Sequence, residues 1–353
     1  MDTNSKLKKI IETAVIAGAS DIHISSGRVP AMRVSGSLVT IIDQAELTQS
    51  EVFGMIKEMV VDEKKVGDFL ENQELDFAYD FKEGVRLRGN SFFQKGEISI
   101  ALRLIPHVKT FQELNLPEAL AQFAHKKQGF FLIVGPVGQG KSTTMAAIID
   151  TINKERAEHI VTIEEPIEYI FESKKSIIDQ REVGIDTKSF EAALKSAFRE
   201  DANVLMLGEM RSPETISAAV TAAETGHFVI STLHTNNASQ TIDRIIDSFP
   251  GPQQAQIRNQ LSSSLLGIFS QRLIPRVSGG LVPAYELLIN TKASANLIRE
   301  GRTHEIDMII ETGSENGMID MNHSLVELVR KGEISVDDAR RFSLNPKAFD
   351  NLL

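Results

Sequence analysis

The sequence contains no cysteine and no tryptophan, and it has only three tyrosines among its 353 residues. The absence of cysteine excludes a structural disulfide and any zinc site built on thiolates, and it fits a reducing compartment. No run of about 18 apolar residues occurs, so we expect no membrane-spanning helix. The segment Met1–Lys6 leads into an amphipathic stretch and not into the apolar core of a signal peptide. These features favour a cytoplasmic location.

Basic residues are also in short supply, with 38 Lys and Arg against 48 Asp and Glu and a net charge of −10. A surface of this sign repels phosphate backbones, which disfavours nucleic-acid binding unless a basic patch is hidden by the average. Hydrophobic residues make up 42% and charged residues 24%, which are ordinary values for a globular chain. The length suits two domains.

Residues 1–105 predict a small α+β domain. Apolar positions between residues 6 and 17 follow the helical period, and a capping box from Thr48 to Glu51 begins a second helix. Three later segments alternate apolar and polar residues and are joined by short turns, which predicts an antiparallel meander. These segments are residues 75–81, 85–89 and 98–104. We expect residues 106–117 to form a linker.

The pattern changes in residues 118–353, where short continuous apolar runs alternate with helical stretches. The runs are residues 130–134, 160–163, 204–207 and 228–230, and the helical stretches are 142–153, 189–200 and 213–224. Buried strands that alternate with helices predict an α/β domain with a doubly wound parallel sheet. From about residue 252 onward we expect mostly helices.

A phosphate-binding loop follows the first of these runs. The sequence fits G-x-x-x-x-G-K-[ST] at every fixed position, between an apolar run ending at Val134 and a helix starting near Ser142. Glycines let backbone N–H groups surround phosphate oxygens, and the helix N-terminus adds positive potential. Lys141 is expected to reach the β- and γ-phosphates of ATP, and Ser142 to bind Mg²⁺. The predicted ATP-binding residues are Gly135, Pro136, Val137, Gly138, Gln139, Gly140, Lys141, Ser142 and Thr143.

Carboxylates close two other apolar runs. Glu209 follows Val204–Leu207 in the manner of a Walker B element, whose acid faces Mg²⁺ or its waters. Glu164, Glu165 and Glu168 gather after residues 160–163, which costs electrostatic energy unless a cation or a proton transfer uses them. The alternatives are a surface ion pair or helix cap for Glu209, and a solvated loop for the second group.

His227 and His234 flank the apolar run at 228–230. They are seven positions apart, too far for metal ligands on adjacent helical turns. The run is expected to lie beside the phosphate loop, so one or both histidines can hydrogen-bond to a γ-phosphate or sense its loss. The alternative is a structural role for each ring.

Arginines interrupt the strands of the first domain. Arg86 and Arg88 share a face of one predicted strand with Asn90, and Arg103 interrupts the last strand. A solvated sheet face is the plain interpretation. The alternative is an arginine finger, inserted across an interface to neutralise charge in a transition state.

Together these segments resemble the type II/IV secretion ATPase superfamily, and within it the retraction ATPases of type IV pili. Residues 19–24 are similar to the family's N-terminal motif, 162–168 to its Asp box, 208–211 to its Walker B ending, and 226–236 to its His box. The resemblance implies a PAS-like N-terminal domain, a RecA-like ATPase domain and a homohexameric ring. It also implies that Glu164 activates water, that Glu209 holds the Mg²⁺ shell, and that Arg88 and Arg103 reach ATP from the N-terminal domains.

Two features favour retraction over pilus extension or type II secretion. The extension and secretion members usually carry a tetracysteine zinc motif, and this chain has no cysteine. The residues Asn296, Leu297, Ile298, Arg299, Glu300 and Gly301 match the second part of the A-I-R-N-L-I-R-E-G retraction motif. Ala293–Ala295 depart from its first part, and Glu165 replaces the usual Asp of the Asp box.

The phosphate loop predicts an MgATP-binding protein, and the resemblance implies a hexameric ATP-hydrolysing motor that drives pilus retraction and twitching motility. Its expected partners are other copies of itself and an inner-membrane platform protein, at the cytoplasmic face of the inner membrane, without nucleic acid. Four alternatives stay open: an assembly or secretion ATPase, an accessory paralogue of the retraction ATPase, a RecA-like nucleic-acid-binding module, and a nucleotide switch that binds ATP without cycling. Adjacent Leu297 and Ile298 in a polar setting are not expected to face one core together. The motif is therefore interpreted as a stretch that transmits force, with an ordinary packed helix as the alternative.

Overall fold

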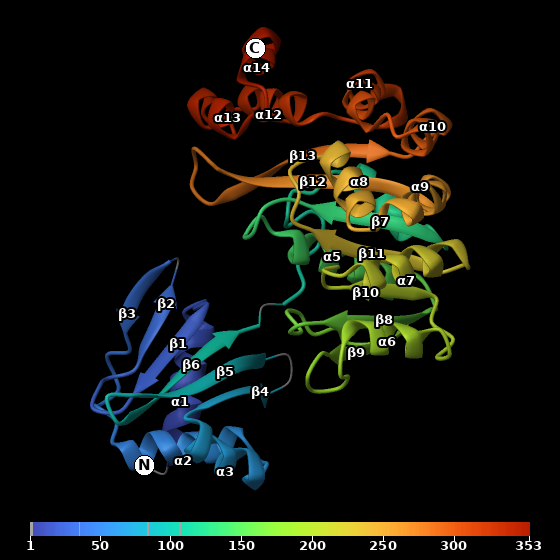
Figure 1. Ribbon diagram of the computed structural model, residues 1–353. Helices are drawn as coiled ribbons and strands as arrows, with labels where there is room; N and C mark the ends of the chain where they lie inside the picture. Colours follow the sequence, from blue (N-terminus) through green and yellow to red (C-terminus); the bar gives the residue numbers. More distant parts are fainter. Residues whose placement is uncertain (1–2, 35, 83–84, 106) are drawn as a thin grey trace. The chain divides into compact units, whose positions relative to one another are not determined.

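The computed structural model describes residues 3–34, 36–82, 85–105 and 107–353. The chain divides into two compact units, Met1–His107 and Val108–Leu353 (Figure 1). Most of the expected linker belongs to the second unit, because Val108, Phe111 and Leu114 pack against its hydrophobic core. Residue 106, also assigned to the linker, lies outside the described residues. Among the described residues, no helix is both long and apolar enough to cross a membrane.

The first unit is an antiparallel sheet with helices, as expected. Its strands are ordered β3-β2-β1-β6-β5-β4, and the predicted meander is the β4, β5 and β6 portion. The capping box is present, because Thr48 and Glu51 exchange backbone-to-side-chain hydrogen bonds at the start of α2. The elements are α1 (Thr3–Ile16), β1 (Asp21–Ser25), β2 (Ala31–Val34), β3 (Ser37–Thr40), α2 (Gln49–Met59), α3 (Glu63–Asn72), β4 (Glu74–Lys82), β5 (Val85–Gln94) and β6 (Glu97–Leu104).

The second unit is built on a seven-stranded sheet in the order β13-β12-β7-β11-β10-β8-β9. All neighbouring strands are parallel except β12 and β13, which pair antiparallel at one edge. The predicted doubly wound parallel sheet is therefore confirmed. The strands are β7 (Gly129–Val134), β8 (His159–Glu164), β9 (Ile177–Glu182), β10 (Val204–Leu207), β11 (Phe228–Leu233), β12 (Leu265–Pro275) and β13 (Leu281–Ile289).

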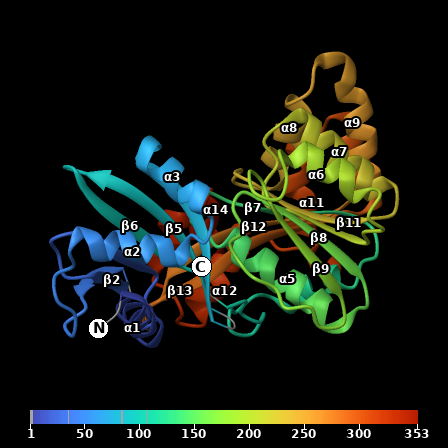
Figure 2. The same cartoon turned by 90° about the horizontal axis from the view of Figure 1, so that it is seen from below.

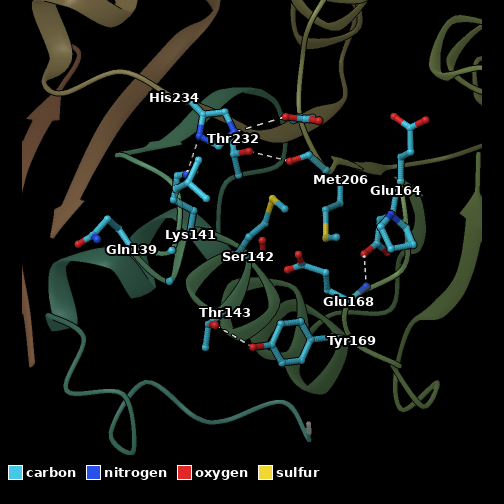
Figure 3. Close-up of a pocket in the computed structure, with 18 of the residues that line it drawn as sticks. Gln139, Lys141, Ser142, Thr143, Glu164, Glu168, Tyr169, Met206, Thr232 and His234 are labelled. Atoms are coloured by element: carbon cyan, nitrogen blue, oxygen red, sulfur yellow. Dashed lines mark hydrogen bonds and ion pairs between the residues drawn. The ribbon is translucent and has the colours of Figure 1, made fainter. Parts of the chain in front are cut away.

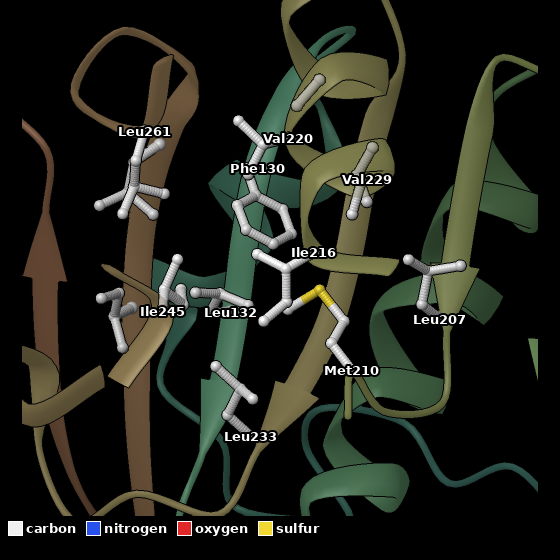
Figure 4. Close-up of a cluster of buried hydrophobic side chains, with 14 of the residues drawn as sticks. Phe130, Leu132, Leu207, Met210, Ile216, Val220, Val229, Leu233, Ile245 and Leu261 are labelled. Carbon is white, nitrogen blue, oxygen red and sulfur yellow. The ribbon is translucent and has the colours of Figure 1, made fainter. Parts of the chain in front are cut away.

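Helices cover both faces of this sheet. Figure 2 shows α5 on one face and α6, α7 and α9 on the other. Successive side chains of a strand point to opposite faces of the sheet. Phe130 and Leu132 of β7 pack in the hydrophobic cluster on one face (Figure 4), and Phe131 and Ile133 pack in the cluster that contains residues of α5. Burial on both faces explains the continuous apolar runs. The helices are α4 (Ala121–Ala124), α5 (Lys141–Glu155), α6 (Phe190–Ala197), α7 (Pro213–Glu224), α8 (Ala238–Asp247) and α9 (Gly251–Ser264).

The prediction of a mostly helical region from residue 252 holds for α9 but is wrong for the residues that follow it, 265–289. After α9 the chain forms β12 and β13, which extend the central sheet beside β7. Polar residues such as Gln271 and Glu286 interrupt the apolar pattern of these strands, although both side chains are buried. The hydrophobic pattern therefore does not indicate the two strands. Helices resume afterwards with α10 (Lys292–Glu300), α11 (Ile306–Thr312), α12 (Met321–Arg330), α13 (Val336–Phe342) and α14 (Pro346–Leu352).

Candidate functional site

Four parallel strands bring the predicted motifs to one edge of the sheet. The order β7-β11-β10-β8 places the phosphate loop after β7, His234 after β11, Glu209 after β10 and Glu164 at the end of β8. These residues line one cavity of about 540 Å³ (Figure 3). The carboxyl ends of the strands are where open α/β sheets bind ligands, because loops and helix N-termini meet there.

The phosphate loop needs its glycines for their backbone conformation. Gly138 and Gly140 have φ angles of +77° and +75°, in the left-handed region that favours glycine. A Cβ on Gly135 would lie 2.5 Å from the carbonyl oxygen of Gln271 on β12, so no side chain fits there. The loop therefore presents its backbone to the cavity at the N-terminus of α5, which is an arrangement that binds phosphate.

Lys141, near the end of the phosphate loop, is buried, with 7% of the residue exposed. Its Nζ donates hydrogen bonds to the carbonyl oxygens of Gly135 and Pro136, at 2.8 and 2.9 Å, and lies 3.2 Å from Nδ1 of His234. Burial lowers the pKa of the ammonium, and the carboxylates of Glu209 and Glu168 oppose that effect. The ammonium is thus held in the cavity by neutral partners that an anion can replace.

Glu209 is at the centre of a charged cluster. Its carboxylate lies 3.4 Å from Nε2 of His234 and forms an ion pair with Arg211. Arg211 also reaches Glu165, at 3.1 Å, so this glutamate of the Asp box is paired within the same cavity wall. His234 therefore connects Lys141 and Glu209 through its two ring nitrogens. Figure 3 shows His234 above Lys141 in the cavity.

Glu164 is almost fully enclosed, with 4% of the residue exposed. Burial raises the pKa of its carboxyl to about 7, although hydrogen bonds from Thr162, Glu168 and Gln180 favour the charged form. A carboxyl poised near neutrality in a polar cavity has the proton affinity that a general base needs.

The two hydroxyl residues of the loop, Ser142 and Thr143, also line the cavity. The Thr143 hydroxyl lies 2.7 Å from the Tyr169 hydroxyl, which connects the loop to the segment after Glu164. The hydroxyl of Ser142 and the carboxylate of Glu209 are oxygen donors, which is the ligand chemistry that Mg²⁺ prefers.

The structure separates the two predicted histidines. His227 precedes β11 at its amino end, where its ring lies 3.1 Å from the carbonyl oxygen of Ala222 and packs edge-on against Phe198. The six-residue strand between them spans about 20 Å. Within the described residues only His234 of the pair lines the cavity, so of the two histidines it is the one that remains a candidate for contact with a γ-phosphate.

Arg88 and Arg103 lie opposite each other on β5 and β6 of the first unit. Together with Asp21 and Asp76 they line a small pocket of about 300 Å³ in that unit. Nε of Arg103 donates to Asp21 at 2.9 Å, while 72% of the Arg103 side chain is exposed. The two guanidinium groups thus form one basic site with an acidic rim.

Two residues that shape the site escaped the sequence analysis. Gln271 of β12 is buried; its Nε2 donates to the carbonyl oxygen of Gln139 at 2.8 Å, and its Oε1 accepts from Thr144 at 2.7 Å. Gln139 in turn accepts from the backbone N–H of Leu273 at 2.7 Å. The phosphate loop is therefore fixed to β12, a strand that was expected to be helical. Tyr169 was missed because no motif contains it.

The segment Asn296–Gly301 is the end of α10. Ile298 is fully buried, and Leu297 packs partly against the same cluster, so the two apolar residues do face one core. Gly301 ends the helix with a φ of +73°, and Arg302 N–H returns to the carbonyl oxygen of Leu297 at 2.9 Å. Arg299 and Glu300 are exposed.

The phosphate loop between a buried strand and a helix, with an acid closing each of two neighbouring strands, defines a P-loop nucleotide-binding protein with a RecA-like sheet. Residues 3–341 match the family model described as "Type II/IV secretion system protein". The chain therefore belongs to the type II/IV secretion system protein family.

Individual relatives narrow the position of the chain within this family. It is 43% identical to a "Type IV pilus retractation ATPase PilT" of Pseudomonas aeruginosa, covering 94% of this chain and 96% of that one. It is 40% identical to "Type IV pilus ATPase PilU" of the same organism, covering 95% and 87%. The structure of the "Pilus Retraction Motor PilT and Bound ADP" matches with a TM-score of 0.89 and 44% identity, and each chain is covered to 98%.

Proposed function

We propose that the cavity binds MgATP and hydrolyses it. The observation that carries this proposal is the convergence of Lys141, Glu164 and Glu209 on one cavity beside the phosphate loop. Lys141 exchanges its two loop carbonyl partners for β- and γ-phosphate oxygens. Glu164 accepts a proton from the attacking water, and His234 contacts the γ-phosphate. The test is steady-state phosphate release by the purified protein with MgATP.

The residues present fit Mg²⁺, because the hydroxyl of Ser142 and the carboxylate of Glu209 are oxygen ligands that line the same cavity. Ser142 would hold the ion, with Glu209 acting partly through water, and the ion would supply positive charge that offsets the charge of the β- and γ-phosphates. Glu209 first has to relax its ion pair with Arg211, which frees that guanidinium within the same cavity.

We further infer that hydrolysis drives the retraction of type IV pili. This rests on 43% identity to the pilus retraction ATPase across nearly the whole chain, and on the match of Asn296–Gly301 to the retraction motif. The motor acts as a homohexamer at the cytoplasmic face of the inner membrane, on a platform protein of the pilus. Arg88 and Arg103 reach the ATP of a neighbouring subunit in that ring.

Deletion of the gene tests the direction of the motor. Loss of retraction leaves more surface pili and abolishes twitching, whereas loss of an assembly ATPase leaves no pili. A deletion strain without surface pili would contradict retraction and indicate a role in pilus assembly. A DNA mobility shift that weakens with salt would revive the nucleic-acid-binding alternative.

An accessory retraction ATPase is the second candidate, because identity to PilU, at 40%, is nearly as high as identity to PilT. The two are separated by complementation. An independent motor restores twitching to a strain that lacks both retraction ATPases, whereas an accessory one restores it only when the other is present.

A further inference from the structure

The two oxygens of the Glu164 carboxylate have different surroundings. The hydroxyl of Thr162 donates to Oε1 at 2.7 Å, and Nε2 of Gln180 approaches the same oxygen at 3.3 Å. Within the described residues, Oε2 accepts one longer hydrogen bond, from the backbone N–H of Glu168 at 3.3 Å (dashed in Figure 3). Side-chain donors therefore converge on one oxygen and leave the other with a single backbone contact.

Gln180 is held in place at both ends of its amide. It lies on β9, which pairs with β8. Its Nε2 also donates to the carbonyl oxygen of Tyr169 at 2.8 Å, and its Oε1 accepts from Phe171 N–H at 2.9 Å. An amide turned over would set its NH₂ group against the Phe171 N–H and its oxygen against two acceptors. The network thus fixes which atom of Gln180 faces Glu164.

Thr162 is held equally firmly. It is fully buried two residues before Glu164 on the same strand, so both side chains leave the same face of the sheet. Its hydroxyl has no exposure to water, and a buried hydroxyl needs a partner. The carboxylate oxygen of Glu164 is that partner, at 2.7 Å.

We propose that Thr162 and Gln180 are positioning residues that hold Oε1 of Glu164 and leave Oε2 as the atom that takes the proton from water. This inference rests on the proposed role of Glu164 as the general base. In the step, an O–H bond of water breaks and an O–H bond to Oε2 forms. The water oxygen bonds to the γ-phosphorus, and the bond from that phosphorus to the bridging oxygen breaks, with its electron pair leaving on ADP.

The charges around Glu164 set the pH at which this step works. Burial raises its pKa to about 7; Thr162, the Glu168 N–H and Gln180 lower it, and the Glu168 carboxylate raises it. Removing either side-chain donor therefore raises the pKa further, so that a higher pH is needed to form the base. Such a variant leaves the other charged groups around Glu164 in place. They are Glu182, its neighbour on β9, and the cavity residues Lys141, Glu165, Glu209, Arg211 and His234.

The test is the pH profile of kcat for ATP hydrolysis in Thr162→Val and Gln180→Met, two replacements that keep shape and lose the donor. We expect the acidic limb of each profile to move up by about half to one pH unit. The dissociation constant for ADP should stay within about twofold, because neither residue lines the phosphate loop. Thr162→Ser, which restores the hydroxyl, should keep the wild-type limb.

A uniform loss of kcat at every pH, or an unmoved limb in both variants, would overturn the inference. Circular dichroism and ADP binding check folding. Gln180→Met carries the test alone if Thr162→Val does not fold, because Gln180 is half-buried on an edge strand. Glu164→Gln distinguishes failure of the proposed general base from failure of the proposed positioning role. If Glu164→Gln hydrolyses ATP at the wild-type rate, Glu164 is not the general base. If Glu164→Gln loses activity while the acidic limbs of the Thr162→Val and Gln180→Met profiles are unmoved, only the positioning role is wrong.

Discussion

The nucleotide cavity and the end of helix α10 use charged residues in opposite ways. In the cavity, Lys141 and Glu164 are almost fully buried. Lys141 donates hydrogen bonds to carbonyl oxygens of the phosphate loop, and Glu164 accepts one from Thr162 on the same strand. At the end of α10, Arg299 and Glu300 are exposed, and their side chains form hydrogen bonds with near neighbours in the chain, Asn296 and Arg302. Buried charges are costly and are kept where chemistry uses them, whereas exposed charges on an anchored helix cost little and remain free to meet another molecule.

The largest expected effect breaks the cavity side of this comparison. Lys141→Ala removes the ammonium beside the phosphates, and we expect ATP hydrolysis to be abolished, because charge on the transferred phosphoryl group loses its partner. Phosphate release from the purified protein measures this. Lys154→Ala, at the other end of α5, is the matched control and should stay near wild type. Equal activity in both variants would place the phosphate site elsewhere.

The second prediction concerns the arginines of the first unit. If Arg103 acts across a subunit boundary, Arg103→Ala alone should greatly reduce hydrolysis, since an arginine finger is worth about 10³–10⁵-fold. Rings mixed from Arg103→Ala and Lys141→Ala subunits should regain part of the activity, because some interfaces pair an intact arginine with an intact phosphate loop. Mass spectrometry has to confirm that the rings are mixed. No recovery in such rings would favour the ion pair of Arg103 with Asp21 as a purely structural contact.

The third prediction asks whether a buried charge outside the cavity lowers stability. Glu286 of β13 is buried and accepts a hydrogen bond from Ala238 N–H at 2.8 Å, and burial raises its pKa to about 8. Because this pKa lies above the unfolded value, the folded state binds the proton more tightly. Stability from this group is therefore present at low pH and is lost as the pH rises toward 8.

Glu286→Gln keeps an acceptor for Ala238 and removes the titration. We expect the variant to match wild type near pH 5 and to be more stable at pH 8.5 by about 1–3 kcal/mol, since one pKa unit corresponds to about 1.4 kcal/mol. Urea unfolding at both pH values measures this. Arg272 keeps its hydrogen bond to Asn236 in the variant. An identical pH dependence in the two proteins would show that Glu286 does not control it.

The same contrast explains what the sequence could and could not predict. The phosphate loop, Glu164, Glu209 and His234 were predictable because each follows an apolar run, and the carboxyl ends of parallel strands meet at one edge. His227 precedes the same strand, so it lies at the opposite end from the phosphate loop, and only His234 reaches the cavity. The sequence does not predict strand β12, because a glutamine such as Gln271 is expected at the surface and not in a buried strand. The hydrogen-bond partners of the Gln271 side chain lie more than 120 positions away in the sequence.

Packing of α10 was likewise beyond the sequence. The hydrophobic pattern indicated that Leu297 and Ile298 would not share a core, yet Ile298 is fully buried and Leu297 is partly covered by the same cluster. Adjacent residues on a helix lie about 100° apart, so both can reach one core that wraps around that side. The separation of buried from exposed positions in Asn296–Gly301 came only from the structure.

The smallest effect on hydrolysis, and the one that sharpens the comparison most, is expected from α10. Arg299→Ala with Glu300→Ala removes two exposed charges and leaves Ile298 and the Gly301 cap intact. We expect folding, ring formation and ATPase activity within about twofold of wild type, because exposed pairs contribute about 0–1 kcal/mol. Pilus retraction should nevertheless fail, with pili accumulating on the cell surface.

A matched control is Glu191→Ala with Lys195→Ala, which removes an exposed pair from α6. It should retract pili normally, so that a retraction defect in the α10 variant is specific to that helix end. Normal retraction in the α10 variant would show that Arg299 and Glu300 do not transmit force. Parallel loss of ATPase activity and retraction would instead make this helix end part of the catalytic unit. In that case the exposed charges of α10 and the buried charges of the cavity would both be needed for ATP hydrolysis. The two regions would then differ in the burial of their charges and not in function.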